Sequence, residues 1–389
     1  MKKPLSLLLT LILACLPLLS LAEADTTDYL YTFIPGNVLQ GEGTQLIHDV
    51  MDAIAIQFTR QREDGGTIVR LRLISEGNEA FTLTAEESAS GDFGLMCSLL
   101  GSNLLVCRRD QTESFLLTIV EMLADLNILK GDSLEKVEGL AKRAAAMLEN
   151  YLSADNAEPE SGINLKPYLK VLEDGASESE VREIPPEERD SLGAVQVATY
   201  KLNEQERREL VDVALEKLNT FPVIGDELKS GNLRIGEQQI TNEFIRKILS
   251  ETPGEMKMEV YTDAEEKLVR LKLIIPDLTD LVTDPTFAKV QGVEMTIRRE
   301  YGAGKQMSSV TTVSLPGLEG DLMTVKLNRS EGERIPELKA KKVREVGELN
   351  SRELWDLVME MKWTIAGNAA NFFLSLPKVI FDLVVDKIF

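Results

Sequence analysis

Hydrophobic and polar residues alternate over short segments in two separate regions of the chain. The alternating segments are 54–58, 69–74, 256–260 and 269–274. A charged turn separates the two segments of each region, and this combination is typical of a β-hairpin. Apolar residues at helical spacing precede each hairpin, at 46–51 and at 240–248, and predict a helix there. The order helix, strand, turn, strand therefore occurs twice.

The strand that follows the turn has nearly the same sequence in both regions. Residues 69–74 are Val-Arg-Leu-Arg-Leu-Ile, and residues 269–274 are Val-Arg-Leu-Lys-Leu-Ile. Alternation by itself makes strands similar, so two unrelated hairpins are the alternative explanation. Because the match stands at the same place in the same order of elements, we favour an internal repeat.

Further strands and helices surround the two hairpins. The additional predicted strands are 81–83, 293–297, 310–315 and 322–327, and the additional predicted helices are 112–123, 133–152 and 203–218. Strands joined by short turns form antiparallel sheets, which often keep one face in solvent. We therefore expect an α+β protein of two similar domains, each a curved antiparallel sheet with helices packed on one side.

Composition divides the chain between these regions. Residues 153–191 contain 11 acidic residues, 4 basic residues and four prolines, which is typical of a linker. Within it, residues 163–172 are apolar enough to dock on a neighbouring element. The expected parts are a signal peptide (1–24), a first α+β domain (25–152), an acidic linker (153–194), a second α+β domain (195–348) and C-terminal amphipathic helices (349–389).

The N-terminus predicts export. Lys2 and Lys3 precede an apolar run that ends in Ala22-Glu23-Ala24, and this order is that of a cleaved secretory signal. We expect cleavage after Ala24 and an extracellular or cell-envelope location. Two alternatives are an uncleaved anchor, because the run is nearly long enough to span a bilayer, and lipidation at Cys15.

Two cysteines remain after cleavage, Cys97 and Cys107. Apolar segments flank Gly101-Ser102-Asn103, which is typical of a hairpin turn. A three-residue loop there would place the two cysteines opposite each other, and exported proteins often carry disulfides. A Cys97–Cys107 disulfide is therefore one prediction, and two small buried apolar side chains are the other.

The C-terminal segment is unusually apolar. A helix is expected from residue 350 through 361, and a second apolar stripe extends to Phe389. The end of the chain carries too many charges for a membrane span, so it either caps a domain, contacts a partner or membrane surface, or plugs a cleft. The residues expected to make such a partner or membrane contact are Phe372, Phe373, Ile380, Phe381, Val384 and Ile388.

Charge and composition argue against several function classes. The chain has 43 Lys and Arg against 64 Asp and Glu, a net charge of −21, and phosphate binding requires clustered basic residues. We therefore expect no nucleic-acid partner. A single histidine, His48, and three cysteines do not provide a zinc site.

No pattern of catalytic residues is found. His48 lies in a predicted helix without a nucleophile nearby, and the glycines do not form a phosphate-binding loop. Asp277, Asp280 and Asp284 lack the spacing of a calcium loop, so we interpret them as a loop with a helix cap. We expect no catalytic residues, no metal and no cofactor.

In its order of elements, over residues 36–330, the chain resembles exported bacterial envelope proteins with half-barrel domains, the lipoprotein carriers and mycobacterial lipid carriers. That resemblance implies a curved sheet, closed by helices, that holds an acyl chain. We expect a secreted, non-enzymatic protein that binds an apolar or lipid-like ligand. The alternative is an envelope interaction module that uses sheet edges or the C-terminal helix.

Overall fold

The computed structural model describes residues 26–40, 42–63, 66–88, 92–125, 138, 141–142, 169–172, 179–220, 228–252, 254–276, 278, 282, 284–303, 306–335, 340–376 and 378. Among them, no helix combines the length and the hydrophobicity needed to span a bilayer.

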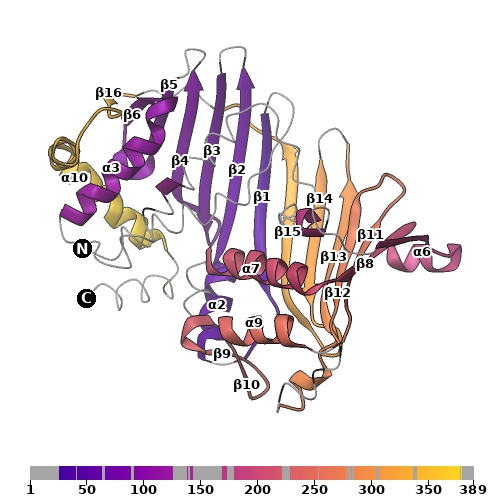
Figure 1. Ribbon diagram of the computed structural model, residues 1–389. Helices are drawn as coiled ribbons and strands as arrows, with labels where there is room; N and C mark the ends of the chain where they lie inside the picture. The colour runs from indigo at the N-terminus through magenta and orange to yellow at the C-terminus, as the bar shows by residue number, and fades with distance from the viewer. Residues whose placement is uncertain are drawn as a thin grey trace.

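One large open sheet dominates the structure (Figure 1). Its fourteen strands lie in the order β16-β6-β5-β4-β3-β2-β1-β15-β14-β13-β12-β11-β8-β7. Every neighbouring pair is antiparallel except β16 and β6, which are parallel. The strands are β1 (Thr26–Pro35), β2 (Ile54–Glu63), β3 (Gly66–Ser75), β4 (Asn78–Ser88), β5 (Asp92–Cys97), β6 (Asn103–Arg108), β7 (Ser179–Glu183), β8 (Gln196–Leu202), β11 (Met256–Thr262), β12 (Leu268–Ile274), β13 (Gly292–Tyr301), β14 (Met307–Ser314), β15 (Asp321–Glu331) and β16 (Lys342–Glu345).

Helices and a small hairpin complete the described structure. The helices are α2 (Glu42–Ala53), α3 (Thr112–Asp125), α6 (Pro186–Leu192), α7 (Glu204–Thr220), α9 (Asn242–Glu251) and α10 (Ser351–Ser375), with 3₁₀ turns η2 (Ser98–Leu100), η3 (Arg109–Gln111) and η4 (Phe287–Lys289). The hairpin is β9 (Leu233–Ile235) with β10 (Gln238–Ile240). The fold is therefore mixed α+β, as predicted.

The two predicted regions share one sheet, because β1 and β15 pair over nine residues. Tyr31 lies opposite Leu327 in this pairing, and both side chains are fully buried. The expectation of two similar domains, each with its own sheet, is not confirmed.

The sheet contains two runs of six strands with the same chain order. One run is β1 to β6, with α2 between its first and second strands. The other is β8 and β11 to β15, with α7 and α9 between its first and second strands. The matching segments 69–74 and 269–274 lie in β3 and β12, the third strand of each run. The predicted helix–strand–turn–strand order is confirmed at both places.

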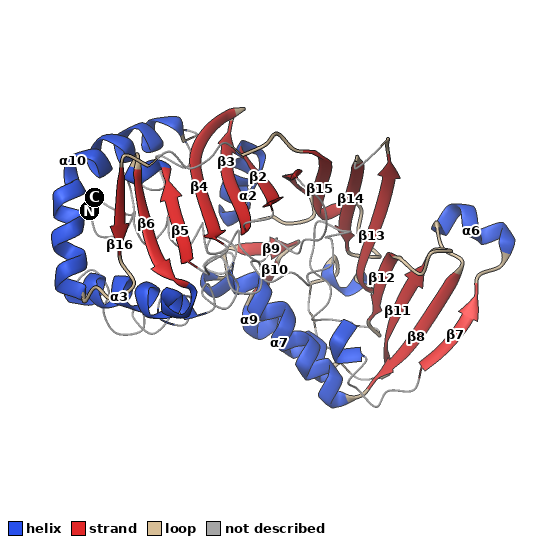
Figure 2. Ribbon diagram, turned by 90° about the horizontal axis from the view of Figure 1, so that it is seen from above, coloured by secondary structure: helices blue, strands red, loops and turns tan. Residues whose placement is uncertain are grey.

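Helices and apolar side chains gather mainly on one face of the sheet, which we call the covered face. Opposed residues of paired strands point to the same face, so Tyr29, Phe58 and Leu71 share it. The side chains of α7 and α9 pack there against β11, β12 and β13, and those of α3 and α10 pack against β5 and β6. Figure 2 shows these two groups of helices at different parts of the sheet. At the far edge, Leu192 of α6 instead packs with Val197 and Tyr261 on the opposite face.

Part of the predicted linker is ordered structure. Residues 179–183 form β7, which pairs with β8, and α6 follows directly. Val171 and Leu172 are buried in the core under α7 and α9, so the predicted docking of this apolar segment is confirmed for those residues. Of the predicted helix at 133–152, only residues 138, 141 and 142 are described, and they are helical.

The predicted Cys97–Cys107 disulfide is wrong, because both thiols are free. The predicted three-residue turn is longer, since η2 occupies residues 98–100. Cys107 consequently lies opposite Phe93, four residues from Cys97. Four residues correspond to roughly 13 Å along a strand, too far for a disulfide. The alternative of small buried side chains fits better: Cys107 is buried, and Cys97 is partly buried against the central core.

We expect the β1–β15 contact to contribute strongly to stability. Leu327→Ala removes a fully buried side chain opposite Tyr31 and should lower the free energy of unfolding by about 2–5 kcal/mol. The measurement is urea unfolding, with the exposed neighbour Lys326→Ala as control. Equal effects of the two substitutions would contradict the burial of this contact.

Candidate functional site

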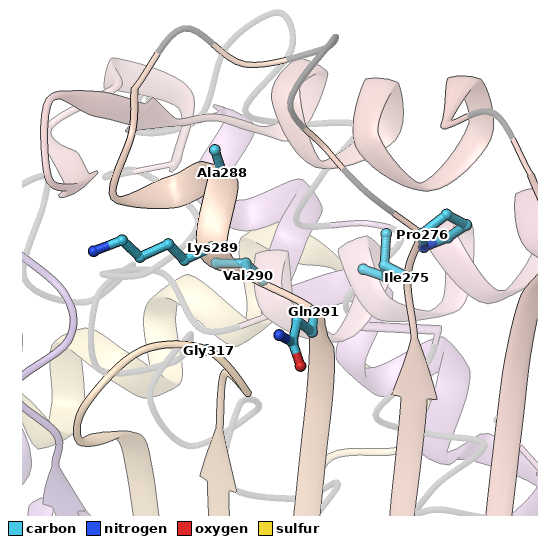
Figure 3. A pocket seen from close by; sticks show the side chains of 7 residues that line it. All are labelled: Ile275, Pro276, Ala288, Lys289, Val290, Gln291 and Gly317. Atoms are coloured by element: carbon cyan, nitrogen blue, oxygen red, sulfur yellow. The ribbon is translucent and has the colours of Figure 1, made fainter.

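A pocket of about 520 Å³ lies at one end of the second six-stranded run. It forms where β12 ends, where β13 begins and where the turn from β14 to β15 returns (Figure 3). The lining residues are Ile275, Pro276, Ala288, Lys289, Val290, Gln291 and Gly317.

Backbone hydrogen bonds fix the walls of the pocket relative to one another. The Ile275 N–H donates to the Gln291 carbonyl at 2.9 Å, and the Gln291 N–H donates to the Pro316 carbonyl at 2.8 Å. Gly317 has φ +98°, and a Cβ there would clash with the Lys289 carbonyl oxygen. Only glycine fits this close approach without a shift of the backbone.

Asp284 holds the short helix that supplies two lining residues. Its Oδ1 accepts hydrogen bonds from the N–H groups of Thr286 and Phe287, both at 2.8 Å, at the start of η4. Its Oδ2 accepts from the Glu237 N–H at 2.8 Å, in the turn between β9 and β10. The N-cap residue of η4 is Thr286, and Asp284, two residues earlier, provides the carboxylate that accepts the first N–H groups, so the predicted loop with a capping aspartate is confirmed in this sense. Asp277 and Asp280 lie outside the described residues.

The environment of Asp284 favours its charged form. The N–H groups of Phe287 and Glu237 lower the pKa of its carboxyl below the usual value, against an opposing effect of burial. Gly236 lies against this carboxylate with φ +61°, and a Cβ there would be 2.8 Å from Oδ1. Both the backbone angle and the space therefore require glycine.

The lining combines an apolar interior with polar groups at the rim. Ile275 and Val290 are buried, Ala288 and Pro276 are half-buried, and Lys289 and Gln291 are exposed. Behind η4, the ring of Phe287 packs edge-on against Phe244 of α9, with centroids 5.0 Å apart. This arrangement can hold an apolar group and offer an ammonium and an amide to a polar end.

The described residues show no sign of a metal centre or an activated thiol. Among them, no group of three His, Cys, Asp or Glu side chains could bind a metal. Burial raises the pKa of the Cys97 and Cys107 thiols, which is opposite to the shift of a nucleophilic cysteine.

A second surface lies on α10. Met359, Trp363, Ala366, Ala370 and Leu374 are exposed and, at helical spacing, form one apolar stripe. Trp363 is 80% exposed and Leu374 is 79% exposed. The Lys362 ammonium lies 5.6 Å from the centre of the Trp363 ring.

The strand β16 lies beside this part of α10. Glu360 of α10 pairs with Lys342 at 3.3 Å and with Arg344. These two cations lower the pKa of the Glu360 carboxyl, with the Arg344 hydrogen bond as the main cause. The pairs tie the edge strand to the helix.

The predicted contact residues do not form a common surface. Phe372 is buried, not exposed, because its ring packs edge-on against Phe81 of β4 at 6.2 Å. That expectation is corrected: Phe372 belongs to the core, as in the alternative that the C-terminal segment caps a domain. The side chain of Phe373 and residues Ile380, Phe381, Val384 and Ile388 lie outside what the structure describes.

Sequence reasoning missed both the pocket and the stripe on α10. For the pocket, the available signals were the turn dipeptide Pro316-Gly317 and the long connection after residues 269–274. For α10, the helical spacing of Met359, Trp363 and Leu374 was visible, but not which face of the helix is exposed.

Comparison of the chain with family models, curated proteins and solved structures finds no match.

The capping role of Asp284 predicts a pH-dependent stability difference. Because its pKa is lowered in the folded state, its stabilising effect is present above the unfolded value of about 3.9 and is lost as the pH falls through the folded value. Asp284→Asn should therefore lower the melting temperature near neutral pH, and the difference from wild type should shrink in acid. Thermal unfolding from pH 7 to pH 2 measures it, and a constant difference would contradict the role.

Proposed function

We propose that this is an exported, non-enzymatic protein that binds an amphipathic, lipid-like ligand in the pocket between β12, β13 and the β14–β15 turn. The observation that carries the proposal is the pocket itself. Its volume of about 520 Å³ is within the usual range for ligand sites, and its interior is lined by Ile275, Val290 and Ala288. The open sheet with helices mainly on one face supports the carrier-like architecture implied by the resemblance.

The rim favours a ligand with an acidic end. Lys289 lines the pocket and is exposed; its side chain extends away from Ile275 and Pro276 (Figure 3), and a rotation about its side-chain bonds would bring the ammonium to a carboxylate or phosphate of the ligand. Gln291 offers a further donor beside it. A long apolar chain with one anionic head, such as a fatty acid, matches this combination of interior and rim.

The lining also supports a binding role over catalysis. It contains no carboxylate, histidine, cysteine or hydroxyl side chain that could act as a general base or a nucleophile. Among the described lining residues, Lys289 is the single side chain that could act as a nucleophile or base, and its exposure to solvent favours the charged ammonium, which retains an anionic ligand and does not attack it.

The first experiment is native mass spectrometry of protein purified from its own host, followed by lipid analysis under denaturing conditions. We expect a stoichiometric extra mass that ionises as a lipid. Recombinant protein should bind palmitate, and Ala288→Trp should abolish binding because the indole fills the pocket. Lys289→Glu should weaken the binding of palmitate more than the binding of the uncharged hexadecanol.

The matched control is Lys326→Glu, an equal change of charge at an exposed position of β15. This variant should bind palmitate and hexadecanol as tightly as wild type does. Wild-type protein that carries no lipid and binds neither probe would reject the proposal. If Ala288→Trp still binds palmitate, the ligand is bound at another site and this pocket is not the binding site.

A second candidate function is contact with a membrane surface through α10. The observation that favours it is the stripe of Met359, Trp363 and Leu374, because tryptophan and nearby lysine are frequent at the headgroup level of bilayers. The net charge of −21 favours zwitterionic over strongly anionic surfaces.

This candidate predicts binding to phosphatidylcholine vesicles without a gain from added anionic lipid. Trp363→Ser should reduce the bound fraction about tenfold, since burial of a large apolar side chain stabilises by about 1.5–3 kcal/mol. Vesicle co-sedimentation measures the effect, and Lys326→Ser is the control. Equal binding of wild type and Trp363→Ser would exclude this role for α10.

A further inference from the structure

The two six-stranded runs correspond residue by residue as well as in strand order. Starting from the matched third strands, Leu73 lies opposite Ile56, which lies opposite Tyr31. In the second run, Leu273 lies opposite Met258, which lies opposite Tyr200. The tyrosines on the first strands, Tyr31 of β1 and Tyr200 of β8, therefore occupy equivalent positions on the covered face.

The same correspondence reaches the last strand of each run. Leu105 of β6 lies opposite Leu95 and then Ala85, on the side of β3 that carries Val69. In the second run, Val325 of β15 lies opposite Thr311 and then Ile297. Ile297 is two residues from Met295, which lies opposite Leu271, just as Ala85 is two residues from Leu83, which lies opposite Leu71. The strands β6 and β15 are thus equivalent, and so are β1 and β8.

The joint in the middle of the sheet is therefore a head-to-tail contact. The last strand of one run, β15, pairs with the first strand of the other, β1. A contact between two unlike edges can be repeated without limit, because each added unit again presents one free edge of each kind. At the ends of the sheet, β6 and β8 are the remaining edges of these two kinds.

Both of these edges are covered by short strands of similar sequence. The strand β16 (Lys342–Glu345) pairs with β6, and β7 (Ser179–Glu183) pairs with β8. Each ends in Val-Arg-Glu. Their central valines are largely exposed, Val181 by 57% and Val343 by 61%. Short, charged outer strands are a known means of keeping sheets from joining edge to edge.

We propose that β7 and β16 are caps on a surface for a second copy of this chain. With the caps displaced, β6 of one copy pairs antiparallel with β8 of the next, as β15 pairs with β1 within the chain. The register follows from the internal joint, where Val325 lies opposite Phe33 and Leu327 lies opposite Tyr31. It places Leu105 opposite Leu202 and Cys107 opposite Tyr200 of the second copy.

The side chains at the proposed contact suit it. Leu105, Cys107 and Leu202 are buried on the covered face, and Tyr200 is half-buried there. Pairing in this register continues the apolar side of one copy into that of the next, as the internal joint does. The other occupant of a free sheet edge, an extended peptide from an unrelated protein, has no such matching register.

The test uses two variants that each free one edge. Arg344→Pro removes an N–H from β16 on the side that faces β6, since the N–H groups of Lys342 and Val346 donate to the carbonyls of Ser102 and Val106. The double substitution Val181→Pro and Arg182→Pro disrupts β7 whichever of its N–H groups face β8. Light scattering after size exclusion gives the mass of each variant, of their mixture and of the combined variant.

We expect wild type and each single-edge variant to remain monomeric, because each lacks one of the two edges. An equimolar mixture should form a dimer, and the combined variant should form a concentration-dependent ladder. Monomers throughout would overturn the proposal. Single-edge variants that associate alone as strongly as the mixture would also overturn it, because the contact would then be non-specific.

Circular dichroism and thermal unfolding establish that each variant is folded before its mass is interpreted. Should Arg344→Pro fail to fold, Glu360→Ala is the second route to a loosened β16, since Glu360 is an exposed side chain that holds both Lys342 and Arg344. Mixed with the β7 variant, Glu360→Ala should form a dimer, though less than Arg344→Pro would, whereas wild type mixed with the β7 variant should stay monomeric. Absence of any association by this folded pair would count equally against the proposal.

Discussion

The pairing of β1 with β15 is the constraint on which the rest of the structure depends. Nine residue pairs join the first strand of the chain's described part to a strand about three hundred residues later. Each backbone hydrogen bond adds only about 0.5–1.5 kcal/mol, so the joint depends on the side chains above it. Tyr31, Val325 and Leu327 are buried there, in a central cluster that lies along the sheet between the core under α7 and α9 and that under α3 and α10.

One-sided coverage follows from this joint. A continuous antiparallel sheet has a single alternation of side chains across all its strands, so one face must be mainly apolar if both runs are to bury their residues together. The opposite face carries Thr32, Thr312, Thr324 and Lys326 near the joint, which tolerate solvent. Most helices gather on the first face because it offers the larger apolar surface, and α6 alone among the described helices packs on the apolar cluster of the opposite face at the far edge.

Local pattern predicts much of this fold and little of its register. The hairpins at β2–β3 and β11–β12 follow from alternation and charged turns, and the helices before them follow from apolar spacing. The cysteine hairpin does not, because η2 inserts residues whose sequence resembles a strand, and this shifts β6 by four residues. Phe372 was ambiguous for a different reason: a helical stripe indicates an apolar face but not whether a sheet covers it. The joining of the two runs could not be predicted, since it depends on a contact between distant strands.

The pocket shows where two equivalent runs differ. In the first run, β3 and β4 are joined by Glu76 and Gly77 alone, a tight turn that leaves no space for a cavity. In the second run the same connection spans residues 275–291, and it includes Asp284, η4 and six of the residues that line the pocket before β13 begins. A repeated scaffold conserves strand positions because the core requires them, whereas a connection at the end of a strand can lengthen without loss of core contacts. The pocket is therefore found in the connection that is longer in the second run, and Asp284 is the residue that gives that longer connection a defined shape.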